Sequence, residues 1–144
     1  DSIRTEWRIH MKAEIKTEPV FLTDKNHIVV LEALCGAPGA ALPDTCKPFE
    51  VLEPGMTEGA SEKHLPLVET DGLHVTVKVG EIFHPMGEDH SIGWVCLTTK
   101  AGCTMRVCLN SDCEPVAHFT LEQGDSPVAA YAYCNLHGLW KTNI

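Results

Sequence analysis

The segment Leu73-His74-Val75-Thr76-Val77-Lys78-Val79 alternates apolar and polar side chains from end to end. Successive side chains of a β-strand point to opposite faces, so this alternation predicts a half-buried strand with its leucine and valines on one face. Similar short segments follow, separated by glycine, asparagine, aspartate or proline, at 92–98, 104–109, 115–121 and 128–133. Several short strands with such turn signals predict a β-sandwich.

The N-terminal third has a different composition. An apolar run at 28–34 is followed, from residue 35 to residue 61, by a stretch rich in glycine, proline and alanine with scattered acids. This composition is typical of turns and linkers, and it places a domain boundary between residues 53 and 61. We therefore expect two domains, residues 1–53 and residues 54–144.

Bulk properties exclude several classes of protein. The 144 residues, 44% hydrophobic and 22% charged, suffice for one good core or one small domain plus an appendage. The net charge of -9 argues against a nucleic-acid partner, because phosphate binding relies on clustered Lys and Arg. No apolar run is long enough to span a bilayer, and no signal-peptide pattern opens the chain, which predicts no membrane partner. Seven cysteines without a signal peptide favour reduced thiols in the cytoplasm.

Candidate metal ligands gather in three segments. Cys134-Asn135-Leu136-His137 places a thiol and an imidazole three positions apart, while His64 and the pair His84 and His90 lie upstream. Four imidazoles and one thiolate are too many for a structural zinc site, which closes at four donors. This ligand set favours a redox iron with an open coordination position.

Four separated blocks of the chain resemble, in order and with compatible spacing, the signature segments of superoxide reductases, the desulfoferrodoxin and neelaredoxin family. The blocks are Glu62-Lys63-His64-Leu65-Pro66, Val77-Lys78-Val79-Gly80, His84-Pro85-Met86 through His90, and Tyr133-Cys134-Asn135-Leu136-His137-Gly138-Leu139-Trp140. The resemblance covers roughly residues 54–141. It implies a mainly β protein: an immunoglobulin-like seven-stranded β-sandwich, with a small N-terminal β appendage domain.

The resemblance also implies an enzyme with one catalytic non-haem iron. Cys134 would be the axial ligand, and four histidines would be equatorial: His64, His84, His90 and His137. Superoxide would react at the remaining axial position and leave as hydrogen peroxide. Glu62 would close that position in the oxidised enzyme, and Lys63 would attract the anion. A small electron donor such as rubredoxin, and a homodimer or higher homo-oligomer, are further implications.

The N-terminal domain departs from the family pattern. Two-domain members carry a desulforedoxin-like module with four iron-binding cysteines, whereas here Leu22 and Lys25 stand where the first pair is expected and Thr45-Cys46 where the second is expected. A four-thiolate site cannot be built from these residues. We therefore expect residues 1–53 to be a degenerate module without metal, and the chain to hold one iron rather than two.

Two other functions compete with the enzyme. A cupredoxin-like electron-transfer protein also uses an upstream histidine and a C-terminal cysteine and histidine, but its weak axial methionine has no counterpart in 138–144. A structural zinc module would leave one histidine, Glu62 and Lys63 without a purpose.

The remaining candidate ligands have little support. Cys103, Cys108 and Cys113 recur every five residues, yet a fourth ligand is missing, so we expect ordinary thiols, as for Cys96. Cys35 and Cys46 are expected to be free in a reducing cytoplasm, although a disulfide between them is the alternative. Four histidines outside the blocks are predicted not to be ligands: His10, His27, His74 and His118.

Overall fold

The computed structural model describes residues 14–36, 48–55 and 59–144. Contacts between Cα atoms divide the chain into two compact units, Asp1–Leu52 and Glu53–Ile144. Within the described ranges, no helix has the length and apolar character that crossing a membrane would require.

The first unit contains one antiparallel sheet with the strand order β2-β1-β3. Its strands are β1 (Glu14–Thr23), β2 (Val30–Gly36) and β3 (Glu50–Val51). β3 lies in the stretch expected to be turns and linker, so that expectation is too simple; its two residues pair with the end of β1. Leu22 lies in β1 and Lys25 in the following turn, whereas Thr45 and Cys46 fall outside the described residues. The degenerate desulforedoxin-like origin of this unit stays a prediction.

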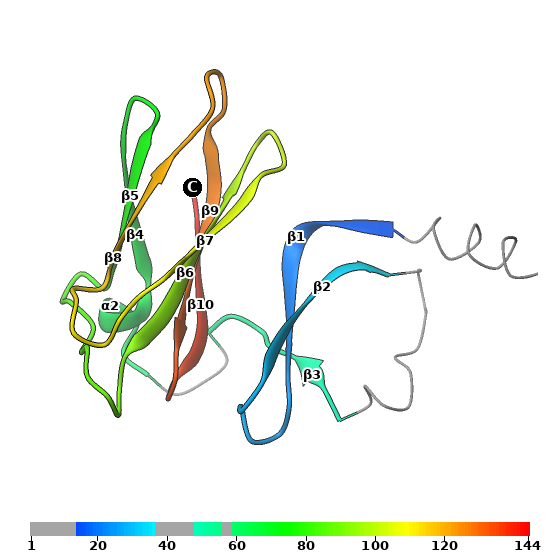
Figure 1. The fold of residues 1–144 in the computed structure, drawn as a ribbon, viewed down its shortest axis with the longest axis vertical. Helices are drawn as coiled ribbons and strands as arrows, with labels where there is room; N and C mark the ends of the chain where they lie inside the picture. Colours follow the sequence, from blue (N-terminus) through cyan, green and yellow to red (C-terminus); the bar gives the residue numbers. More distant parts are fainter. Residues whose placement is uncertain (1–13, 37–47, 56–58) are drawn as a thin grey trace, which may run out of the picture. The chain divides into compact units, whose positions relative to one another are not determined.

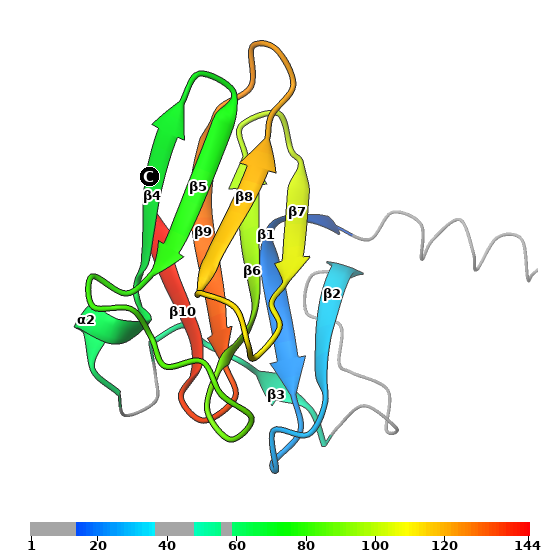
Figure 2. The same cartoon turned by 60° about the vertical axis from the view of Figure 1, so that its left-hand side comes forward.

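The second unit is a β-sandwich of a four-stranded sheet, β10-β9-β6-β7, and a three-stranded sheet, β4-β5-β8. The strands are β4 (Pro66–Asp71), β5 (His74–Val79), β6 (Ile92–Thr99), β7 (Thr104–Cys108), β8 (Val116–Thr120), β9 (Pro127–Cys134) and β10 (Gly138–Asn143). Figure 1 shows both units, and Figure 2 shows the three-stranded sheet laid over the four-stranded one. The predicted mainly β, seven-stranded sandwich is confirmed.

The five strands expected from alternation are all present, each within two residues of its predicted ends. Two further strands, β4 and β10, complete the seven, and a single helical turn, α2 (Ser61–His64), precedes β4. α2 carries Glu62, Lys63 and His64, which were expected on a loop or at a strand end.

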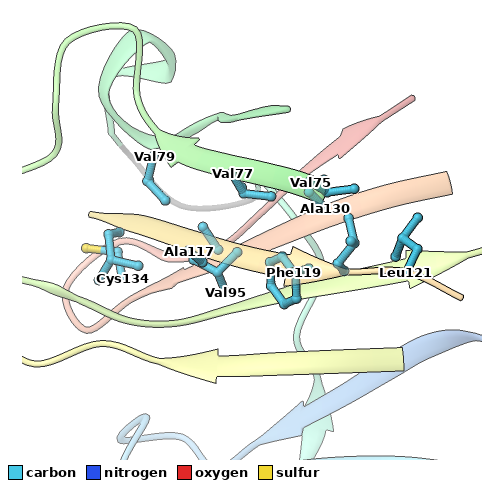
Figure 3. Packing of buried hydrophobic residues seen from close by; sticks show 12 residues of the cluster. Val75, Val77, Val79, Val95, Ala117, Phe119, Leu121, Ala130 and Cys134 are labelled. Atoms are coloured by element: carbon cyan, nitrogen blue, oxygen red, sulfur yellow. The ribbon is translucent and has the colours of Figure 1, made fainter. Parts of the chain in front are cut away.

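The core lies between the two sheets and extends to the thiol of Cys134. Val75, Val77 and Val79 are fully buried on one face of β5, as their alternation predicts, and they belong to one cluster with alternate residues of β9. Figure 3 shows Cys134 at one end of this cluster. Because Cys134 continues the inward-facing series of β9, the strand itself brings the thiol to the end of the core.

Candidate metal centre

Five side chains converge at one end of the sandwich. His64 ends α2, His84 and His90 lie in the loop between β5 and β6, Cys134 ends β9, and His137 lies in the β9–β10 turn. Their nearest possible ligand atoms all lie within 4.8 Å of one another. All the predicted metal ligands are therefore brought together, although the segments that carry them are far apart in the sequence.

The two most buried imidazoles are oriented by backbone carbonyl groups. Nδ1 of His64 lies 2.8 Å from the carbonyl oxygen of Ala60, and Nδ1 of His84 lies 2.7 Å from that of Pro85. When Nδ1–H donates to these oxygens, Nε2 carries the free lone pair. The two Nε2 atoms are 3.1 Å apart, and Nε2 of His64 is also 3.1 Å from Nδ1 of His137. Lone pairs therefore point toward one common centre.

The thiol of Cys134 approaches this centre from the apolar interior. Burial raises the pKa of the thiol, while backbone N–H groups of Leu136 and His137 act against that rise. The His137 N–H lies 3.4 Å from Sγ. A bound cation favours the thiolate strongly, and these amides then donate to a charged sulfur.

Burial also keeps three of the histidines neutral, namely His64, His84 and His90. It lowers the pKa of His84 to about 4, although the hydrogen bond to Pro85 acts in the opposite direction. The pKa values of His64 and His90 are lowered too, with burial again the largest cause. Neutral imidazole is the form that binds a metal, so these three side chains are ready to do so at neutral pH.

The donor atoms of this cluster are better satisfied by a metal ion than by hydrogen bonds to one another. Nε2 of His90 is buried and has no hydrogen-bond partner among the described residues. Buried polar atoms without a partner are rare and costly, and a coordinated ion would satisfy this nitrogen. Five nitrogen and sulfur donors exceed a closed zinc shell and suit an iron centre.

Two neighbouring side chains hold the ligand loops in place. Asn135 accepts a hydrogen bond from Ser91 N–H at 3.0 Å and donates to the carbonyl of Asp89 at 2.9 Å, so it joins the cysteine turn to the loop beside His90. Sequence reasoning missed this role, because an asparagine within Cys-x-x-His gives no sign of its partners. Trp140 stacks on His64 with ring centroids 4.8 Å apart and donates from its indole to the carbonyl of His137.

Glu62 and Lys63, both exposed, lie on α2 immediately before His64. The helix is tied to the chain after β5, where Ile82 N–H donates to the carbonyl of Glu62 and Gly80 N–H to that of Leu65. These bonds fix where α2 presents its side chains. The positive charge of Lys63 also acts on His64 and His90, lowering their pKa values.

Replacing Gly80 by alanine is expected to disturb α2 and the centre. Gly80 has φ +89, and an added Cβ would clash with the carbonyl of Ile82 and lie 2.7 Å from that of Lys63. We expect a loss of about 1–3 kcal/mol in the free energy of unfolding, together with less bound iron. Urea titration and metal analysis measure the two effects.

The matched control is Gly72→Ala. Gly72 also has positive φ, +59, but its added Cβ would meet nothing within 4 Å. In Gly72→Ala we expect only the loss of stability that comes from placing alanine at a positive φ, and a normal iron content. An equal loss of stability in both variants would contradict the steric argument at Gly80.

The other cysteines remain apart from the centre. Cys103, Cys108 and Cys113 are free thiols, and neither they nor Cys96 belong to a metal-capable group among the described residues. Whether Cys35 and Cys46 form a disulfide lies outside the residues whose side chains are described.

Residues 56–143 match the protein family described as Desulfoferrodoxin. The chain belongs to the desulfoferrodoxin family. It is 42% identical over 96 residues to a desulfoferrodoxin homolog of Archaeoglobus fulgidus, covering 67% of this chain and 74% of the relative. It is 38% identical over 114 residues to the desulfoferrodoxin of Syntrophotalea carbinolica, covering 78% of this chain and 86% of the relative. The crystal structure of the superoxide reductase from Treponema pallidum superposes with a TM-score of 0.74 at 33% identity, covering 88% of this chain and 99% of that one.

Proposed function

We propose that this desulfoferrodoxin is a superoxide reductase, which converts superoxide to hydrogen peroxide by adding one electron and two protons. The observation that carries the proposal is the convergence of four imidazoles and one thiol within 4.8 Å. The similar protein from Treponema pallidum is itself a superoxide reductase. The cupredoxin and zinc alternatives both leave part of this donor set unused.

We propose that one non-haem iron per chain is held by His64, His84, His90, His137 and Cys134. The iron, when bound, supplies the electron that reduces superoxide. The backbone contacts of His64 and His84 set the orientation of two rings in advance, so little reorganisation is needed on binding. The Cys134 thiolate would donate electron density to the iron from the apolar interior of the sandwich. Thiolate ligation is one way in which proteins adjust the reactivity of an iron centre.

Metal analysis combined with visible spectroscopy tests this function. We expect one iron per chain, a strong thiolate-to-ferric absorption band, and consumption of superoxide that yields peroxide without releasing dioxygen. Copper in the purified protein would support an electron carrier instead. A colourless zinc protein without superoxide consumption would overturn the proposal.

Lys63 is proposed to draw superoxide toward the centre. The whole chain carries a net charge of -9, which repels an anion, so a local cation is needed. Lys63 is exposed, and its charge is felt by two of the proposed ligands, His64 and His90. Its ammonium group is therefore close enough to make the electrostatic potential at the centre more positive while it remains in solvent.

For Lys63→Ala we expect the rate constant for superoxide capture to fall roughly tenfold or more and to depend less on salt. Iron content should stay normal, because the side chain is not a proposed ligand. Lys78→Ala is the charge-matched control, since Lys78 is paired with Glu69 at 3.3 Å. Stopped-flow kinetics over a series of ionic strengths makes the comparison, and equal effects of the two changes would rule out local steering.

Glu62 is proposed to bind the oxidised iron in place of substrate. For Glu62→Ala we expect turnover to continue while the absorption spectrum of the oxidised protein changes, because a carboxylate has left the metal. Glu88→Ala removes another exposed carboxylate, from the loop between His84 and His90, and should leave the spectrum as it is. An unchanged spectrum in Glu62→Ala would remove this residue from the site.

We further propose a cytoplasmic protein that receives electrons from a small carrier such as rubredoxin and works as a homodimer or higher homo-oligomer. The free thiols of Cys103, Cys108 and Cys113 support a reducing compartment. Exposed apolar side chains in the first unit, such as Ile28 at 77%, support self-association.

A further inference from the structure

A second pair of histidines lies on the outer face of the three-stranded sheet. Nε2 of His74, on β5, is 3.2 Å from Nδ1 of His118, on β8. In the strand register His74 faces Thr120, two positions from His118, so the pair are diagonal neighbours on one face. Both side chains are exposed.

We propose that His74 and His118 form a second metal site, which binds a divalent transition ion of the zinc type. This differs from the sequence-based expectation, which left both residues as non-ligands because they lie outside the four blocks that resemble the family. The proposal does not rest on the iron centre or on superoxide chemistry.

The spacing of the two nitrogens fits one shared ion. With zinc–nitrogen bonds of about 2.0–2.1 Å, two nitrogens in a tetrahedral shell are about 3.3 Å apart. The observed 3.2 Å is close to this distance. A similar distance separates imidazole nitrogens in the candidate metal centre, where Nε2 of His64 lies 3.1 Å from Nε2 of His84 and from Nδ1 of His137.

Other donors stand next to the pair. Asp71 lies opposite His74 in the register of β4 and β5, on the same face, and its exposed carboxylate can complete the shell by rotation, together with water. The Thr76 hydroxyl lies 3.4 Å from Nδ1 of His118. The nearest cation along β5, Lys78, is already paired with Glu69, so its charge opposes an incoming ion less.

This site is separate from the first centre. His74 begins β5, whereas α2 adjoins the other end of that strand, about 17 Å away at 3.4 Å per residue. Figure 2 shows the β4–β5 turn and α2 at opposite ends of the sheet. An ion held by His74 and His118 would join β5 to β8 by their side chains, in addition to the backbone pairing of the two strands.

Calorimetric titration of the iron-loaded protein with Zn²⁺ tests the proposal. We expect one additional ion per chain with micromolar affinity. His74→Gln and His118→Gln should each weaken it at least about tenfold, since even the outer partners of metal ligands are worth about 10- to 100-fold. His27→Asn is the control, because it removes an exposed histidine elsewhere and asparagine tolerates the positive φ of 55 at that position.

Two checks accompany the titration. The thiolate band must stay unchanged, which shows that zinc has not displaced iron, and the melting temperature without zinc should be the same in all four proteins. Zinc should raise the melting temperature of the wild type and of His27→Asn only. Absence of saturable binding to the wild type, or a loss confined to one of the two histidine variants, would overturn the shared site.

Discussion

Replacing Cys134 by serine is expected to lower superoxide turnover at least about a hundredfold and to abolish the thiolate-to-ferric absorption band. The thiol is completely buried and continues the inward face of β9, so the strand holds the replacement atom in the same place. A serine hydroxyl stays protonated where a thiol becomes a thiolate. Stopped-flow kinetics and visible spectroscopy of the oxidised protein measure the two losses.

Cys108→Ser is the matched control for this change. Cys108 is a free thiol on the same sheet, but it is exposed and lies outside the metal-capable cluster. We expect normal turnover and a normal band in that variant. Circular dichroism of Cys134→Ser shows whether the fold survives, and a folded variant with full activity and an unchanged band would remove Cys134 from the ligand set.

The metal-free protein is expected to lose about 3 kcal/mol of its free energy of unfolding as the pH falls from about 6.5 to about 4. Burial lowers the pKa of His84 from 6.5 to about 4 in the folded chain. Between these two values the unfolded chain binds a proton that the folded chain does not, so acidification favours unfolding. His64 and His90, whose pKa values are also lowered, act in the same direction.

Urea titrations of the metal-free protein at pH 7.5 and pH 4.5 measure this effect. In His84→Leu the titrating imidazole is gone, so the free energy of unfolding should change less between the two pH values. His27→Asn should behave as the wild type. Protons and metal compete for the same imidazoles, so the iron-loaded protein should release its metal over the acidic side of this range. Equal stability of the metal-free wild type at both pH values would contradict the buried-histidine argument.

Alternation identified β5, whereas β6 and β9, which bury several consecutive residues, were identified as short segments between turn residues, and β4 and β10 were missed. In β5 the pattern from His74 to Val79 is strictly alternate, so the strand was plain from the sequence. In β10, Leu139 and Trp140 are buried in succession, and no period of two remains. In β4, only Pro66 is fully buried and the following residues are mostly exposed. These two strands were recognised only from their pairing with β5 and β9 in the sheets.

The proposed metal ligands could be named from the sequence because each lies in a recognisable local block. Their supports could not be named in this way. Asn135 joins two loops through backbone atoms of Asp89 and Ser91, and such atoms are present at every residue whatever its side chain. Gly80 is required because the carbonyl group of Lys63, in α2, lies close to it in addition to that of Ile82, two residues further along the chain, and the approach of α2 is a property of packing.

The amino-acid sequence by itself determined the class of fold, the family resemblance and the choice of the five proposed donors, because strand period, turn residues and ligand chemistry are local properties of the chain. Only the tertiary structure decided how these donors converge, which ring nitrogens face the centre, and that His74 meets His118. Those features depend on sheet register and side-chain packing, which join residues such as His64 and His137 that are 73 positions apart. Contacts over such separations exist only once the two sheets have packed around their common core.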